Sequence, residues 1–124
     1  MPKAKIMIVD DDAGTRLVLS TRLRAHHYDV VMASDALQAI TIVRKESPNL
    51  LILDIGLPGG DGFLVVQRLK AIPAFASIPI IIISAAVDPR LSESKALDVG
   101  AEAFLSKPVE PDELLATVKM IVGD

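Results

Sequence analysis

The chain of 124 residues predicts an α/β fold in which one doubly wound sheet of five parallel strands carries helices on both faces. One observation is a series of apolar runs without polar alternation, which is typical of strands buried on both sides. Another is that apolar residues between these runs recur at spacings of three and four, which indicates amphipathic helices. Because no linker, repeat or low-complexity tract interrupts this alternation, we expect residues 1–124 to form a single domain.

Five segments are predicted to be strands, at residues 6–9, 28–32, 50–53, 78–83 and 103–105. Four helices are predicted from apolar stripes at Leu17 and Leu23; at Leu37, Ile40 and Val43; at Val65, Leu69 and Ile72; and at Leu114, Val118 and Ile121. A fifth helix, at residues 89–99, has the thinnest stripe and is expected to be weakly anchored. That stripe contains Leu91, Ala96, Leu97 and Val99.

Residues that begin and end helices agree with these boundaries. Ser34 or Asp35 can cap the second helix, and the glycine-rich turn 59–62 precedes the third. Gly100 lies where a helix C-cap belongs, and Pro111 opens the last helix, followed by acidic residues that the helix dipole favours. The resulting alternation places the carboxyl ends of all five strands at one edge of the sheet, where folds of this class bind their ligands.

Acidic residues follow two of the predicted strands. Asp10, Asp11 and Asp12 come directly after the run 6–9, and Asp54 ends the run 50–53. If those strands are neighbours, the carboxylates repel one another, and their ionised forms are disfavoured unless a cation binds among them. Mg²⁺ suits a site with a few carboxylates and several waters. The sequence therefore predicts a Mg²⁺ site at this edge of the sheet.

Four segments that include strand ends carry a family pattern: 8–12 (IVDDD), 53–62 (LDIGLPGGDG), 79–85 (PIIIISA) and 100–108 (GAEAFLSKP). Their order and spacing resemble the receiver domain of two-component response regulators, over residues 5–122. The resemblance implies a flavodoxin-like strand order, 2-1-3-4-5. It also implies a phosphorylation-dependent switch in a bacterial two-component system, the His-Asp phosphorelay.

The resemblance implies that Asp54 is the phosphoacceptor, a carboxylate nucleophile that takes a phosphoryl group from a histidine kinase or a phosphotransfer protein. It implies a Mg²⁺ cofactor bound by Asp11 directly, by Asp10 through water, by Asp54, and by the backbone carbonyl of Gly56. Mg²⁺ neutralises charge that develops on the transferring phosphoryl oxygens. Phosphoryl uptake and loss are then self-catalysed, unlike the turnover of a conventional enzyme, and the altered surface controls a downstream protein or a linked output domain.

Four further positions receive roles from the same resemblance. Lys107 pairs with Asp54 and then with the phosphoryl group. The hydroxyl of Ser84 hydrogen-bonds a phosphoryl oxygen, and Ser84 and Phe104 together form the switch. Pro108 follows a peptide bond that is expected to be cis.

Some positions depart from the family pattern. The switch aromatic is often Tyr in the family and is Phe104 here, and Gly56 and Ala86 carry no functional side chain where the family tunes loss of the phosphoryl group. The dimerising transcription factors of the family usually have Arg at the position of Thr117. We therefore expect a monomer or a weak, phosphorylation-dependent dimer.

Simpler interpretations compete with these assignments. Residues 10–12 could be a solvated acidic turn that caps the next helix, and Asp12 is assigned mainly to that role. Lys107 could be a surface lysine and Ser84 a helix cap. The whole chain could be a pseudo-receiver that binds proteins and is never phosphorylated. A haloacid-dehalogenase-type phosphatase is disfavoured, because that family has Thr or Val where this chain has Gly14.

Composition bounds the remaining classes. The net charge of −3 and the pI near 5.3 disfavour direct binding of nucleic acid by this domain. The absence of cysteine excludes disulfides and thiolate metal sites, and it fits a cytoplasmic location. No apolar run approaches the ~20 residues needed to cross a bilayer, so no membrane association is expected. His26 and His27 are expected to be exposed near the end of the first helix rather than to act as phosphodonors or ligands.

Overall fold

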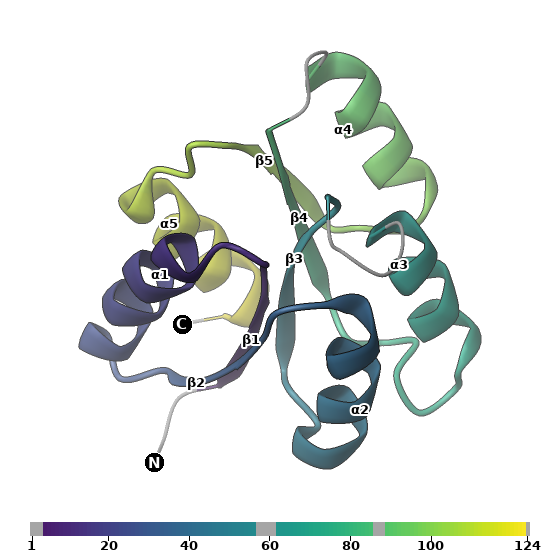
Figure 1. The fold of residues 1–124 in the computed structure, drawn as a ribbon, viewed down its shortest axis with the longest axis horizontal. Helices are drawn as coiled ribbons and strands as arrows, with labels where there is room; N and C mark the ends of the chain where they lie inside the picture. Colours follow the sequence, from purple (N-terminus) through teal and green to yellow (C-terminus); the bar gives the residue numbers. More distant parts are fainter. Residues whose placement is uncertain (1–3, 57–61, 86–88, 124) are drawn as a thin grey trace.

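The computed structural model describes residues 4–56, 62–85 and 89–123, which form a parallel sheet between two layers of helices (Figure 1). The strands are β1 (Lys5–Val9), β2 (Asp29–Ala33), β3 (Leu50–Asp54), β4 (Ile80–Ser84) and β5 (Ala103–Ser106). The helices are α1 (Ala13–Ala25), α2 (Ala36–Glu46), α3 (Gly62–Ala71), α4 (Pro89–Asp98) and α5 (Pro111–Val122). The order β2-β1-β3-β4-β5 confirms the predicted fold class and strand order.

Each face of the sheet has its own hydrophobic core, because successive side chains of a strand point to opposite faces. On one face, Ile6, Ile8 and their counterparts on β3 and β4 pack against α1 and α5. On the other, Met7, Val9 and their counterparts pack against α2, α3 and α4. The three central strands are completely buried apart from Lys5, so their apolar runs lack the alternation of a half-exposed sheet.

Several helical residues predicted to be in the core are exposed. Leu17 and Leu37 are 67% and 80% exposed, and Leu97 is 55% exposed. The residues of α1 and α2 that are buried instead include Ser20 and Ala36. The same helices also bury Leu19, Leu23 and Val43, so the buried face is set by how each helix is turned against the sheet, which the spacing of its large residues alone does not fix.

Two predicted boundaries also shift. The fourth strand begins at Ile80 rather than at residue 78, although the carbonyl of Pro79 still accepts a hydrogen bond from the amide of Leu51. Ile72 lies just beyond α3. Of the α4 side chains that are described, residues 93–98, Ala96 is the buried one, which agrees with the expected weak anchoring.

The helix ends follow the predicted chemistry. Asp35 rather than Ser34 caps α2, since its Oδ1 accepts the amide of Gln38 at 2.8 Å. Gly100 ends α4 with φ of 95°, a left-handed conformation that favours glycine. Pro111 is in the first turn of α5, which Glu110 caps. Most of the predicted turn 59–62 lies outside the described residues, which resume at Gly62.

Among the helices of the described residues, none is long and apolar enough to span a membrane.

Candidate functional site

The register of the sheet brings two of the predicted acids together. Val9 on β1 pairs with Leu53 on β3, so Asp10 and Asp54, the next residue of each chain segment, lie side by side at the carboxyl edge. Both are buried, and Asp10 is completely inaccessible to solvent. A buried carboxylate is stable only if it is paired or binds a cation, so this edge of the sheet needs positive charge.

Lys107 supplies part of that charge. It follows β5, and its Nζ lies 2.8 Å from Asp10 Oδ2 and 3.0 Å from Asp54 Oδ2. Burial tends to lower the pKa of Lys107, but the contacts with Asp10 and Asp54 outweigh it and raise the pKa above the ordinary value. The ammonium is therefore held in its charged form between the two carboxylates. The peptide bond that joins Lys107 to Pro108 is cis, as expected.

One ammonium does not balance the cluster. Carboxylate oxygens of Asp10, Asp11 and Asp54, the acidic cluster, all lie within 4.8 Å of one another. Asp10 Oδ2 is buried and forms only an ion pair, and no donor in the described part of the chain hydrogen-bonds this oxygen in good geometry. Three oxygen donors with an excess of negative charge fit a hard divalent cation such as Mg²⁺.

Asp12 stands apart from the acidic cluster. Its carboxylate accepts the amides of Gly14 and Thr15 at 3.2 and 3.3 Å, and the hydroxyl of Thr15 at 2.6 Å. These hydrogen bonds, first of all that from the Thr15 hydroxyl, lower the pKa of Asp12. Asp12 is thus the N-cap of α1, as predicted, and the competing interpretation of the acidic triplet holds for this one residue.

Gly56 and Ser84 lie beside the acidic cluster. The amide of Gly56 donates to Asp54 Oδ1 at 3.0 Å, which orients the carboxylate whose other oxygen contacts Lys107. Ser84 is buried at the end of β4, and its carbonyl accepts the amide of Lys107 at 2.8 Å.

Phe104 pairs with Ile82 across β4 and β5, is partly buried, and packs against the core under α2, α3 and α4. Ala86 lies outside the described residues. His27 is exposed beyond α1, whereas His26 is partly buried, and its Nδ1 contacts the carbonyl of Arg22 at 3.1 Å.

Sequence reasoning missed one contributor. Arg16, on the first turns of α1, donates from Nη1 to the backbone carbonyl of Asp10 at 2.6 Å. No role was predicted for Arg16, because a hydrogen bond from a helix back to the loop before it depends on how α1 is oriented, which the spacing of residues does not fix.

The family model described as response regulator receiver domain matches residues 6–119. The chain belongs to this family. A probable transcriptional regulator, ycf27, of Porphyridium aerugineum is 37% identical over 98% of this chain. The chain spans about half of that protein (49%), so the receiver domain accounts for only part of that relative.

Solved structures of receiver proteins superpose closely. A putative response regulator from Chloroflexus aurantiacus is 33% identical, with a TM-score of 0.91 over 98% of this chain and 99% of that one. The chemotaxis response regulator CheY4 of Vibrio cholerae is 28% identical, with a TM-score of 0.88 over 96% and 98% of the two chains. The likeness thus covers the whole receiver fold.

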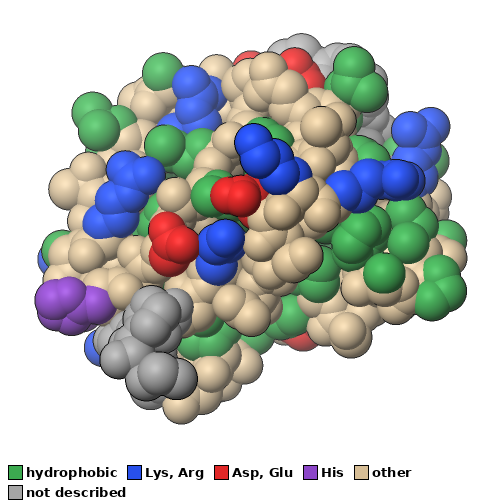
Figure 2. Space-filling model, turned by 90° about the horizontal axis from the view of Figure 1, so that it is seen from below, with side chains coloured by type: hydrophobic (Ala, Val, Ile, Leu, Met, Phe, Trp, Pro, Cys, Tyr) green, Lys and Arg blue, Asp and Glu red, His purple; other side chains and the backbone are tan. Residues whose placement is uncertain are grey.

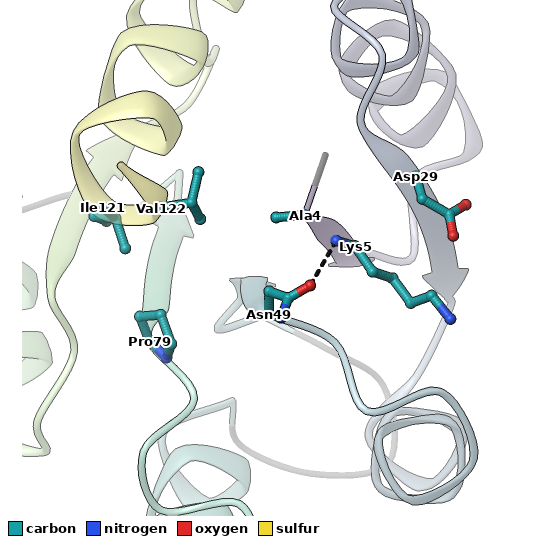
Figure 3. A pocket seen from close by; sticks show the side chains of 7 residues that line it. All are labelled: Ala4, Lys5, Asp29, Asn49, Pro79, Ile121 and Val122. Carbon is teal, nitrogen blue, oxygen red and sulfur yellow. Dashed lines mark hydrogen bonds between the residues drawn. The ribbon is translucent and has the colours of Figure 1, made fainter. Parts of the chain in front are cut away.

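A pocket of about 550 Å³ lies at the other end of this receiver domain (Figure 3). Its lining comes from the amino ends of the strands, where the amide of Lys5 donates to Asn49 Oδ1 at 2.8 Å, and from Ile121 and Val122 of α5. This pocket contains none of the predicted site residues. On the face shown in Figure 2, Lys and Arg side chains form separate groups with hydrophobic side chains between them.

Proposed function

We propose that this receiver domain is a phosphorylation-dependent switch of a His-Asp phosphorelay and that Asp54 is its phosphoacceptor. The observation that carries the proposal is the position of Asp54, a buried carboxylate whose two oxygens contact the Gly56 amide and the Lys107 ammonium. These contacts hold the carboxylate in one orientation at the edge of the sheet. A nucleophile held in this way loses little further freedom when a donor arrives.

The reaction would be a transfer between two protein side chains. The bond from phosphorus to a ring nitrogen of the donor's phosphohistidine breaks, and a bond from phosphorus to an Asp54 oxygen forms. The electron pair of the broken bond stays on the imidazole, which takes up a proton. Lys107, already in contact with Asp54, then pairs with the phosphoryl group, and the Ser84 hydroxyl hydrogen-bonds it.

The acidic cluster and the Gly56 carbonyl would hold Mg²⁺, which neutralises charge on the transferring oxygens when bound. With three carboxylates and one ammonium, the cluster has a formal charge of −2, and one divalent cation balances it. A second ammonium would leave one negative charge unbalanced, so the charge count favours Mg²⁺. Hydrolysis of the aspartyl phosphate would return the domain to its first state.

Ser84 and Phe104 would convert phosphorylation into a change of surface. Phe104 has no hydroxyl to hold it in solvent, and it already packs partly into the core. We infer that phosphorylation completes a shift that the unmodified domain samples, rather than creating it. A downstream protein or a linked output domain in the cytoplasm would bind this changed surface.

The test is phosphoryl uptake from a small donor, phosphoramidate, followed by intact-protein mass spectrometry. We expect one phosphoryl group per chain with Mg²⁺ and almost none after chelation. Asp54→Asn should abolish uptake. The matched control, Asp12→Asn, alters a neighbouring acid but keeps the α1 cap, because Asn also caps helices, and should still be labelled.

Three results would contradict the proposal. Undiminished labelling of Asp54→Asn would move the phosphorylation site elsewhere. No uptake by the parent protein would indicate a pseudo-receiver that acts only by binding. Continuous release of phosphate at a rate far above one equivalent would indicate a phosphatase.

A further inference from the structure

The guanidinium of Arg16 reaches back from α1 across the acidic triplet to the carbonyl of Asp10. We propose that Arg16 is a positioning residue for the metal site, which it serves by fixing the peptide group between Asp10 and Asp11. This inference rests on the Mg²⁺ site of the proposed function. It assigns a role to a residue that contacts no carboxylate of the acidic cluster in the interactions described above.

The planarity of the peptide group is the first step of the argument. The carbonyl of Asp10 and the amide of Asp11 share one rigid plane that ends at the Asp11 Cα, so a bond that fixes the carbonyl also fixes the Asp11 Cα and restrains the backbone from which the Asp11 side chain leaves. The Arg16–Asp10 bond is short, at 2.6 Å, and partly buried. Because its donor is charged, it is stronger than a bond between neutral groups.

Asp11 depends on its backbone more than its neighbours do. Asp10 is held at its amide by the Ala33 carbonyl, at 3.1 Å, and at Oδ1 by the Asp12 amide, at 2.9 Å. The Asp11 carboxylate is exposed, and the described residues give it no hydrogen bond or ion pair. What aims it at the acidic cluster is therefore the conformation of the chain, which the Arg16 bond restrains.

If Arg16 acts only through its charge, its removal should change Mg²⁺ affinity in one direction, and if it positions Asp11, in the other. Arg16 carries a positive charge close to a cation site, so if charge alone mattered, its removal would tighten Mg²⁺ binding. If Arg16 positions Asp11, its removal weakens Mg²⁺ binding despite the lost repulsion. Partners that orient metal ligands typically change metal affinity by about 10–100-fold when they are removed.

The experiment is isothermal titration of the metal-free protein with Mg²⁺. We expect Arg16→Gln to raise the Kd for Mg²⁺ about tenfold. Arg16→Lys keeps the charge and can donate a single hydrogen bond, so its Kd should lie between those of the parent protein and Arg16→Gln. The matched control is Arg24→Gln. Arg24 lies on the same helix and likewise donates its guanidinium to a backbone carbonyl, that of Val30 on β2, at 3.2 Å, but it lies at the far end of α1.

Melting temperatures and NMR spectra of the metal-free variants separate folding from positioning. Both glutamine variants are expected to lower the melting temperature, whereas only Arg16→Gln should move the amide resonance of Asp11 and raise the Mg²⁺ Kd. Unchanged or tighter binding in Arg16→Gln would overturn the inference. If instead the parent protein bound no Mg²⁺, or Asp11→Asn bound it equally well, the metal site of the proposed function would itself be wrong.

Discussion

Lysine–carboxylate ion pairs occur at both ends of the sheet, but their charges are balanced at only one of them. At the amino end, Lys70 is 3.6 Å from Glu102, and it also donates to the carbonyls of Ala76 and Ile78 at 3.3 and 3.4 Å. Glu102 in turn accepts the amide of Ile80 at 2.6 Å. Every charge of this amino-end clasp, Lys70 and Glu102, has an opposite charge and a backbone partner, so the clasp joins α3, β4 and the turn before β5.

The carboxyl end breaks this balance. Asp10 and Asp54 share the ammonium of Lys107, the described residues give the nearby Asp11 carboxylate no ion pair, and Asp10 Oδ2 is buried without a well-formed hydrogen bond. A group of charges selected only for stability would match their number and satisfy each oxygen. This surplus of negative charge is what the proposed Mg²⁺ site requires, and the amino-end clasp lacks it.

The loss of stability on removing a lysine should differ most between the two ends of the sheet. Lys107→Met leaves two buried carboxylates facing each other and is expected to lower the free energy of unfolding by about 3 kcal/mol. Lys70→Met should cost about 1 kcal/mol, because Glu102 keeps its bond to Ile80 and can reach solvent. Urea denaturation followed by circular dichroism measures both, since the chain has no Trp.

A double variant tests the cause. If repulsion between the freed carboxylates is responsible, Asp10→Asn added to Lys107→Met should recover a large part of the loss. Equal costs for the two lysine variants would show that the ends of the sheet do not differ in the way described.

Tight packing next to Asp54 should give the next largest effect. A Cβ on Gly62 would lie 2.4 Å from the Ile55 Cα and 2.9 Å from the Asp54 carbonyl oxygen, both rigid backbone atoms. Gly62→Ala is therefore expected to destabilise the domain by about 2 kcal/mol. Its control is Gly14→Ala, where the nearest atom is an Asp12 carboxylate oxygen at 3.6 Å and where Ala favours the helix by about 1 kcal/mol. A Gly62→Ala protein as stable as the parent would mean that the backbone of Asp54 and Ile55 moves aside at little cost.

The smallest expected effect has opposite signs at the two ends. Asp11→Asn removes a repelling charge and no hydrogen bond, so it should stabilise the metal-free protein by about 1 kcal/mol. Glu102→Gln breaks the paired charge of the amino-end clasp and should destabilise it by about 1 kcal/mol. Saturating Mg²⁺ should cancel the advantage of Asp11→Asn, which melting curves with and without the metal would show. A loss of stability in metal-free Asp11→Asn would contradict the idea of surplus charge.

Much of the site could be predicted because its residues lie at strand ends. An acid directly after an apolar strand must lie at the carboxyl edge of a parallel sheet, and this rule located Asp10, Asp11 and Asp54. The capping role of Asp12 was equally local, since a cap needs only the amides of the next turn. Arg16 could not be found in this way, because its bond depends on how α1 leaves the strand.

By itself, the sequence determined the alternation of strands and helices, the residues at each strand end, and the caps, since all of these depend on neighbours in the chain. Only the tertiary structure decided which helical faces are buried. Leu17 and Leu37 are exposed while Ser20 and Ala36 are covered, because the face that a helix buries depends on how it is turned against the assembled sheet. It also decided that Lys107 is shared between Asp10, which follows β1, and Asp54, which ends β3, because these distant segments come together only when the sheet assembles.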